Sequence, residues 1–164
     1  MDDVKVRLLQ ALEQNHRITT KALATMLNIT EIKVKEMVEE LEEAGLILGY
    51  VTLIDWEKTG CPDKVTAVID VKVAPQREVG FDVIAERICR FSEVKSVYLM
   101  SGGYDLSVVI EGTSMKQVAY FVAEKLATLE NVQSTITHFV LKKYKQNGIF
   151  FDKDKKDRRL VISP

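Results

Sequence analysis

Cationic and hydroxyl side chains gather in two short stretches near the N-terminus of the chain. The residues of this kind are Arg17, Thr19, Lys21, Thr30, Lys33 and Lys35. Lysine and arginine neutralise phosphate charge, and threonine hydroxyls donate to phosphate oxygens. Ile32 lies among them and is expected to point outward. It would either contact the methyl group of a thymine or be an isolated apolar residue on the surface, and the sequence leaves both alternatives open. These residue types and their spacing predict contact with double-stranded DNA.

Two short helices around a tight turn, within residues 19–46, would position these side chains. Thr19 and Thr30 each precede a helical apolar pattern and are suitable N-caps. Asn28 lies at the turn and tolerates a positive φ, and Gly45 ends the second helix. The apolar residues that would fill the wedge between the helices are Leu23, Ala24, Leu27, Ile29, Val34, Met37, Val38 and Leu41. The pattern predicts a helix-turn-helix, with an ordinary helical hairpin as the alternative.

A further helix is predicted at residues 4–14, with an apolar face that completes a small core. That face consists of Val4, Leu8, Ala11 and Leu12. The charge of this region opposes DNA binding, because the first fifty residues hold six bases and nine acids, a net charge of −3. Four of the nine acids, Glu39, Glu40, Glu42 and Glu43, lie in the C-terminal half of the second helix of the predicted motif. We expect the N-terminal half to face the DNA and the acidic half to point away from it.

Composition sets further limits on function. The chain has 164 residues and a net charge of −1, so it has room for one or two small domains and no overall attraction to DNA. No apolar run approaches the roughly 20 residues that span a bilayer, and the acidic start is unlike a signal peptide. Cys61 and Cys89 match no ligand motif, and His16 and His138 form no catalytic constellation. We expect a cytoplasmic protein with no membrane contact, metal, cofactor or enzymatic site.

From Lys64 onward the hydrophobic period changes from helical to mixed strand and helix. Strands are predicted at 65–73, 94–100, 104–110 and 132–144, and helices at 81–91 and 115–129. The inward face of the second of these helices would carry Val118, Ala119, Val122, Leu126 and Leu129. The order βαββαβ is that of the ferredoxin-like split fold. The predicted fold class is therefore α+β, with an N-terminal (winged) helix-turn-helix domain and a C-terminal ferredoxin-like domain.

The same patterns suggest where the chain divides. Residues 46–54 look strand-like, and a Gly-Cys-Pro sequence follows at 60–62. The predicted parts are a helix-turn-helix domain at 1–49, a strand linker at 50–63, an effector and oligomerisation domain at 64–145 and a basic C-terminal extension at 146–164. Between residues 142 and 159 there are eight bases and three acids, which would help to hold DNA or form a solvated tail.

A ferredoxin-like sheet carries helices on one face only, so its other face has to be accounted for. The apolar residues expected on that second face are Val68, Val97, Leu99, Val109, Phe139 and Leu141. An open apolar face is expected to be buried against another subunit. The pattern therefore predicts a homo-oligomer, which would also hold two helix-turn-helix units at a fixed spacing.

Three short motifs carry a resemblance to a known family. They are Ala22-Leu23-Ala24, Glu42-Glu43-Ala44-Gly45-Leu46-Ile47 followed by Gly49-Tyr50, and Gly102-Gly103-Tyr104-Asp105-Leu106. In this order and spacing, over roughly residues 4–145, the chain resembles the Lrp/AsnC (feast/famine) family of bacterial and archaeal transcription regulators. The third motif is similar to the family's Gly-Tyr-Asp turn between the second and third strands of the effector domain.

The resemblance implies a homodimer that assembles into an octamer or a similar ring, with an amino acid or related metabolite bound between dimers near this turn. The residues then expected at the effector site are Gly102, Gly103, Tyr104, Asp105, Ser134, Thr135 and Thr137, with His138 beside them. Glycine N–H groups would meet a carboxylate, and Asp105 would accept a hydrogen bond from an amino group. The alternative is that the glycines only form a tight hairpin, which Asp105 caps.

Two positions depart from the family pattern, and they define the competing functions. Asn28 stands at the turn where the family usually has glycine, and Met37 stands where its recognition helix usually has arginine. Loss of a base at position 37 predicts weaker DNA binding. We therefore predict a sequence-specific DNA-binding regulator whose assembly responds to an amino-acid-like effector. The alternatives are a metabolite-binding assembly module with weak or lost DNA binding and a small tetrapyrrole-type decarboxylase.

Overall fold

The computed structural model describes residues 2–59, 64–74 and 80–151. The chain divides by packing into two compact units, Met1–Ile54 and Asp55–Pro164. This division follows Ile54, and the finer domain boundaries expected from the sequence stay predictions. Among the described residues, no helix is both long enough and apolar enough to cross a bilayer.

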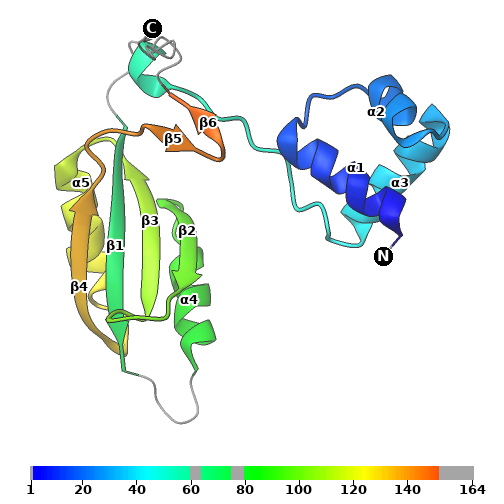
Figure 1. The fold of residues 1–164 in the computed structure, drawn as a ribbon. Helices are drawn as coiled ribbons and strands as arrows, with labels where there is room; N and C mark the ends of the chain where they lie inside the picture. The colour runs from blue at the N-terminus through cyan, green and yellow to red at the C-terminus, as the bar shows by residue number, and fades with distance from the viewer. Residues whose placement is uncertain (1, 60–63, 75–79, 152–164) are drawn as a thin grey trace, which may run out of the picture. The chain divides into compact units, whose positions relative to one another are not determined.

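The N-terminal unit is built from three helices, α1 (Asp3–Gln14), α2 (Thr20–Leu27) and α3 (Glu31–Glu43), shown in blue to cyan in Figure 1. Its buried core consists of Leu8, Leu23, Ala24, Leu27, Val34, Met37 and Leu41. Each of these residues lies on a face that the helical period predicts to be apolar. The expected third wall is confirmed, because Leu8 of α1 is fully buried against the other two helices.

The strand expected at 46–54 is wrong. Residues 46–55 form neither helix nor strand, and a short 3₁₀ helix follows at Trp56–Thr59. Leu48 and Val51 are 94% and 77% exposed in the single chain. Alternating apolar residues do not by themselves form a strand when no neighbouring strand pairs with them. The described residues of the N-terminal unit contain no strand, and therefore no wing.

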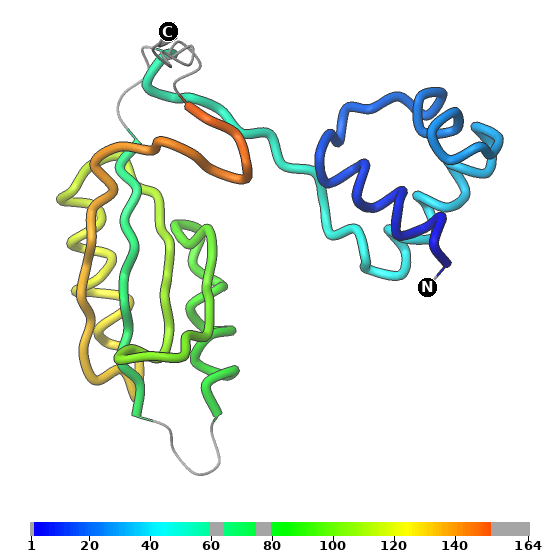
Figure 2. The backbone as a smooth tube through the Cα atoms, viewed as in Figure 1, coloured from blue at the N-terminus to red at the C-terminus, as the bar shows by residue number. Residues whose placement is uncertain are grey.

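The C-terminal unit contains a four-stranded antiparallel sheet of β1 (Val65–Val73), β2 (Val94–Leu99), β3 (Leu106–Gly112) and β4 (Val132–Phe139). The strand order is β2-β3-β1-β4, and Figure 2 shows the last strand, in orange, beside the first, in green. Helices α4 (Phe81–Cys89) and α5 (Met115–Tyr120) lie on one face of the sheet, behind it in Figure 1. The predicted βαββαβ order is confirmed.

The core of this unit lies between the sheet and its helices. The strands contribute Ala67, Ile69, Val71, Val73, Leu106, Val108 and Ile110, and the helices contribute Ile84, Ile88, Val118, Phe121 and Leu126. The helix predicted at 115–129 continues after Tyr120 as a π-helical segment, Phe121–Leu126. Ala119, expected to point inward, is exposed, and Phe121 is buried in its place, with its ring packed edge-on against Phe91 at 5.5 Å.

The sheet face without helices is mixed rather than apolar, which corrects the sequence prediction. Val97 and Leu99 of β2 pair with Val108 and Leu106, and Phe139 pairs with Ala67, so all three lie on the helix side. Leu141 lies beyond β4. The open face instead carries, besides Val68 and Val109, the residues Thr66, Asp70, Lys72, Ser96, Tyr98, Ser107, Glu111, Ser134, Ile136 and His138.

The last strand also ends earlier than predicted. β4 stops at Phe139, and a separate hairpin follows, formed by β5 (Lys145–Gln146) and β6 (Ile149–Phe150). Asn147 and Gly148 form its two-residue turn and have φ angles of 47° and 79°. Two consecutive positive φ angles are characteristic of the type I′ turn, for which Asn-Gly is the preferred sequence.

Candidate nucleic-acid interface and effector turn

Local hydrogen bonds fix the helix-turn-helix at both helix starts and at the turn. The hydroxyls of Thr19 and Thr30 accept hydrogen bonds from the N–H groups of Ala22 and Lys33, each at 3.2 Å, as predicted for N-caps. Asn28 adopts the left-handed conformation, with φ 55° and ψ 46°. Both helix starts are thereby stabilised, and the turn between α2 and α3 is closed.

The end of α3 is held by a Schellman motif. Gly45 has a φ of 67°, its N–H donates to the carbonyl of Glu42 at 3.0 Å, and the N–H of Leu46 donates to the carbonyl of Leu41 at 2.9 Å. Both ends of α3 are therefore capped, the start by the Thr30 hydroxyl and the end by backbone hydrogen bonds.

The predicted DNA-contacting side chains lie at or near the surface of this motif. Ile32 is 71% exposed, which confirms that it points outward. Arg17, Lys21, Lys33 and Lys35 are exposed. The Lys33 ammonium forms an ion pair with Glu36 at 3.2 Å, one turn along the helix. The exposed N-terminal half of α3 therefore offers two ammonium groups, one isoleucine and the two carboxylates of Glu31 and Glu36.

Acidic residues dominate the C-terminal half of α3, as the sequence indicates. Glu40 is paired with Lys5 of α1, and the hydrogen bond from this ammonium lowers the pKa of the Glu40 carboxyl. Glu42 accepts a hydrogen bond from the Tyr50 hydroxyl at 2.8 Å. Two of these carboxylates thus have partners within the unit.

Asp105 of the Gly-Gly-Tyr-Asp sequence ties the turn between β2 and β3 to β1. Its N–H donates to the carbonyl of Val71 at 3.0 Å, and its carboxylate accepts from the N–H of Val73 at 2.9 Å and from the ammonium of Lys72 at 3.2 Å. The hydrogen bond from Val73, together with the nearby Lys72 charge, lowers the pKa of the Asp105 carboxyl. The carboxylate therefore caps the end of the β1–β3 ladder.

Gly102 and Gly103 have no such role within the described chain. Neither has a positive φ, and a Cβ atom added to either would meet no atom within 4 Å. Neither backbone strain nor crowding inside the subunit therefore explains glycine at these positions. The space beside both glycines is open in the single chain.

The predicted effector residues of β4 do not share one face of the sheet. Thr135 and Thr137 pair with Val71 and Ile69 and lie on the helix side. Ser134 and His138 lie on the open face, where Ser134 pairs with Lys72 and the His138 ring lies 3.2 Å from the Asp70 carboxylate. Lys72, which the sequence analysis did not single out, lies between Ser134 and Asp105; its alternation with buried Val71 and Val73 is the signal that places it on this face.

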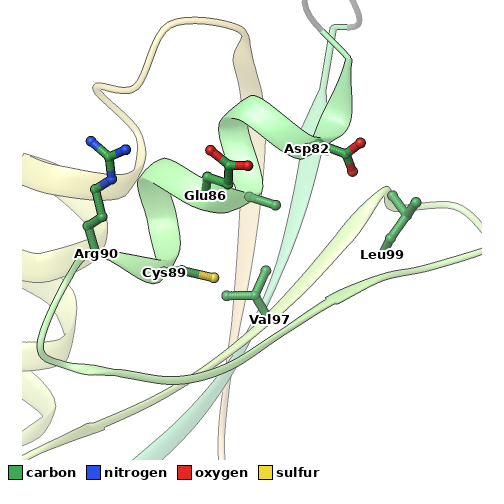
Figure 3. Close-up of a pocket in the computed structure, with 7 residues that line it drawn as sticks. Asp82, Glu86, Cys89, Arg90, Val97 and Leu99 are labelled. Atoms are coloured by element: carbon green, nitrogen blue, oxygen red, sulfur yellow. The ribbon is translucent and has the colours of Figure 1, made fainter. Parts of the chain in front are cut away.

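A shallow groove of about 420 Å³ lies elsewhere, between the outer side of α4 and strand β2. It is lined by Asp82, Ala85, Glu86, Cys89, Arg90, Val97 and Leu99. Figure 3 shows Cys89 beside Val97, with the ends of the Glu86 and Arg90 side chains turned away from Val97. None of the predicted effector residues lines this groove, so the groove and the Gly-Gly-Tyr-Asp turn are separate features. Among the described residues, no group of three His, Cys, Asp or Glu side chains is arranged to hold a metal ion.

Comparison with known proteins identifies both units. Residues 66–150 match the model of the Lrp/AsnC ligand binding domain, and residues 1–47 match a winged helix-turn-helix DNA-binding model. The chain belongs to the Lrp/AsnC family. It is 50% identical over 164 residues to the Bacillus subtilis "uncharacterized HTH-type transcriptional regulator YugG", covering 100% of this chain and 99% of that relative. This Lrp/AsnC chain is therefore a transcriptional regulator with a helix-turn-helix DNA-binding domain and a ligand-binding domain.

Solved Lrp/AsnC structures share the fold. A transcriptional regulator from Neisseria meningitidis, solved as a complex with L-Met, has a TM-score of 0.69 and 25% identity, with coverage of 89% of this chain and 93% of that one. The Mycobacterium tuberculosis leucine response regulatory protein has a TM-score of 0.73 and 23% identity, with coverage of 90% of this chain and 97% of that one. E. coli AsnC has a TM-score of 0.67 and 21% identity, with coverage of 89% of this chain and 95% of that one.

The structure explains the two departures from the Lrp/AsnC pattern. Asn28 takes up the left-handed conformation that makes glycine common at such turns. Met37 is only 4% exposed and belongs to the core of the N-terminal unit. Because its side chain points inward, methionine at this position removes no charge from the exposed surface of α3.

Proposed function

We propose that this Lrp/AsnC protein binds double-stranded DNA sequence-specifically and that an amino acid or related small metabolite changes its oligomeric assembly. The observation that carries the proposal is the α2–α3 motif, in which capping residues fix the recognition helix and leave the N-terminal half of α3 exposed. The residues assigned to DNA contact are Arg17, Thr19, Lys21, Thr30, Ile32, Lys33 and Lys35. Lysine and arginine would neutralise phosphates while side chains of α3 face the bases.

The effector is assigned to the Gly-Gly-Tyr-Asp turn. Supporting this, Gly102 and Gly103 leave space that the subunit itself does not use, and a family member from N. meningitidis was solved as a complex with L-Met. Tyr104, Asp105 and Ser134 would complete the site from one subunit. Thr135 and Thr137, on the other face of β4, would reach an effector only at the exposed edge of the sheet.

Assembly is assigned to the open face of the sheet. This face combines apolar Val68 and Val109 with charged Asp70 and Lys72. A second copy facing it would bury the apolar groups and pair the charged ones, giving a homodimer that associates further into an octamer. An effector that binds one arrangement of dimers more tightly shifts the population toward it and changes how many helix-turn-helix units reach one operator.

Two measurements test the proposal together. Fluorescence anisotropy with the duplex upstream of the protein's own gene is expected to show saturable binding that competitor DNA of random sequence does not remove. Sedimentation velocity at micromolar concentration is expected to show a dimer or larger species whose distribution changes with one of the twenty amino acids. A monomer with and without every amino acid would overturn the assembly mechanism.

The net charge of −3 in the first fifty residues favours a second candidate, a metabolite-binding assembly module with weak DNA binding. The same two measurements separate it from the first. For this second candidate, the sedimentation of the protein would change with an amino acid, and the anisotropy experiment would show no preference for a DNA sequence.

A further inference from the structure

A carboxylate lies at the centre of the exposed face of α3, where the proposed DNA contacts do not account for it. The side chain of Glu36 is 58% exposed, and Glu36 follows the 71% exposed Ile32 by one helical turn. The buried line of α3 runs through Val34, Met37 and Leu41. At about 100° per residue, Ile32 and Glu36 both fall on the opposite side of the helix, and Lys33 and Lys35 flank them.

The exposed face of α3 therefore has lysines along its sides and a different pair of residues along its middle. The two lysines are at the sides, where a helix in a major groove approaches the phosphate backbones. The isoleucine and the carboxylate are in the middle, where the same helix meets base edges. Both middle residues belong to the N-terminal half of α3, within six residues of its start at Glu31, which is the half that enters the groove in this motif.

The ion pair with Lys33 makes a carboxylate tolerable at this position. An unpaired carboxylate next to DNA would be repelled by phosphate charge, and Lys33 lies 3.2 Å from Glu36. Thr30 fixes the backbone of Lys33 by accepting a hydrogen bond from its N–H. The carboxylate therefore meets the groove beside a compensating charge, with its oxygens available as acceptors.

We propose that Glu36 is a specificity-determining residue that accepts a hydrogen bond from the N4 amino group of a cytosine, while Ile32 contacts the methyl group of a nearby thymine. In the major groove, cytosine is distinguished by its amino donor and thymine by its methyl group, and Glu and apolar side chains are their matching partners. Four residues of helix rise about 6 Å, against about 3.4 Å per base pair. The two bases are therefore one or two base pairs apart. The inference rests on the proposed DNA binding and specifies which bases are read.

The test uses the full-length protein and a library of double-stranded DNA with a randomised central segment. Four proteins are compared in the selection: wild type, Glu36→Gln, Ile32→Ala and Glu43→Gln. Glu43→Gln is the matched control, because it makes the same charge change on the same outward side of α3, at the C-terminal end. Thermal unfolding of each variant checks that the exposed substitutions leave the fold intact.

The wild type is expected to select a site with one strongly preferred cytosine and a thymine one or two positions away. Glu36→Gln is expected to replace that cytosine by adenine, because a glutamine amide pairs with adenine N6 and N7, and to change relative affinity for the two duplexes by about 5-fold or more. Ile32→Ala is expected to relax the thymine position alone. Glu43→Gln is expected to select the wild-type site.

Three results would contradict the inference. An identical selected site for wild type and Glu36→Gln would show that Glu36 reads no base, and the proposed DNA binding would stand. The same altered site for Glu36→Gln and Glu43→Gln would show an effect of net charge rather than of a base contact. Failure of the wild type to enrich any sequence at low salt would overturn the proposed function, and the inference with it.

Discussion

The helical N-terminal unit and the sheet of the C-terminal unit differ in how their side chains are divided between fold and function. In α3, Val34, Met37 and Leu41 are buried while Ile32 and Lys33 are exposed, so one helix carries two separate sets of residues. At the turn before β3, Asp105 forms an ion pair with Lys72 of β1 and accepts a hydrogen bond from the N–H of Val73, so fold and proposed binding use the same groups. Substitutions of the exposed residues in the N-terminal half of α3 should therefore change binding alone, and substitutions at the turn should change both binding and stability.

The largest expected effect concerns the two faces of the sheet. Ile69 is fully buried on the helix side, and Ile136 is 43% exposed on the open face. Ile69→Ala is expected to lower the free energy of unfolding by about 2–5 kcal/mol, since it leaves a cavity in a packed core. Ile136→Ala removes the same atoms and is expected to cost less than half as much. Denaturant unfolding followed by circular dichroism measures both, and equal losses would mean that the open face is as well packed as the core.

The second prediction compares lysines of the two units. Lys33→Ala combined with Lys35→Ala is expected to lower the slope of log affinity against log salt by about two, and affinity at 0.1 M salt by about 10–100-fold, because two phosphate contacts are lost. Lys95→Ala combined with Lys116→Ala removes the same charge from exposed positions of the sheet unit. That control should leave the slope unchanged. A salt slope that falls equally in both double variants would mean that net charge, not α3, drives binding.

The three helices of the N-terminal unit could be predicted from the sequence because their 3.6-residue period separates buried from exposed positions, whereas the strand expected at 46–54 is wrong. The caps at Thr19 and Thr30, the left-handed Asn28 and the outward Ile32 all follow from local patterns. Which of these side chains touch DNA stays a prediction, because a single exposed face does not show its partner.

The sheet was less predictable, for a physical reason. Alternation in a strand gives two sets of side chains but does not say which set meets the helices when both contain apolar residues. Pairing decides this, and the pairing of β2 with β3 shifts between Val94 and Ser96. Val97 and Leu99 were therefore assigned to the wrong face. No local pattern marks Lys72, because its partner, Asp105, lies 33 residues away in the sequence.

The third prediction concerns pH and the turn where fold and binding overlap. Asp105→Asn keeps an acceptor for the N–H of Val73 and removes the charge next to Lys72. Because the pKa of Asp105 is lowered in the folded state, its charge stabilises the fold above the ordinary carboxyl pKa of about 4 and loses that effect as pH falls through the lowered value. The melting temperature of the variant should be lower than that of wild type at neutral pH, and the difference should shrink in acid. A difference independent of pH between about 2.5 and 7 would mean that the charge does not stabilise the turn.

The smallest expected effect tests whether the turn of the helical unit is purely structural. Asn28 has a φ of 55°, which glycine adopts freely and alanine does not. Asn28→Gly is therefore expected to change the free energy of unfolding by only a few tenths of a kcal/mol, and Asn28→Ala to lower it by about 1 kcal/mol. Neither should change the DNA sequence selected, because the residues of α3 assigned to base contact are intact in both. If Asn28→Gly leaves stability unchanged and still weakens DNA binding, the Asn28 side chain itself contacts DNA, and fold and function are not separate in the helical unit either.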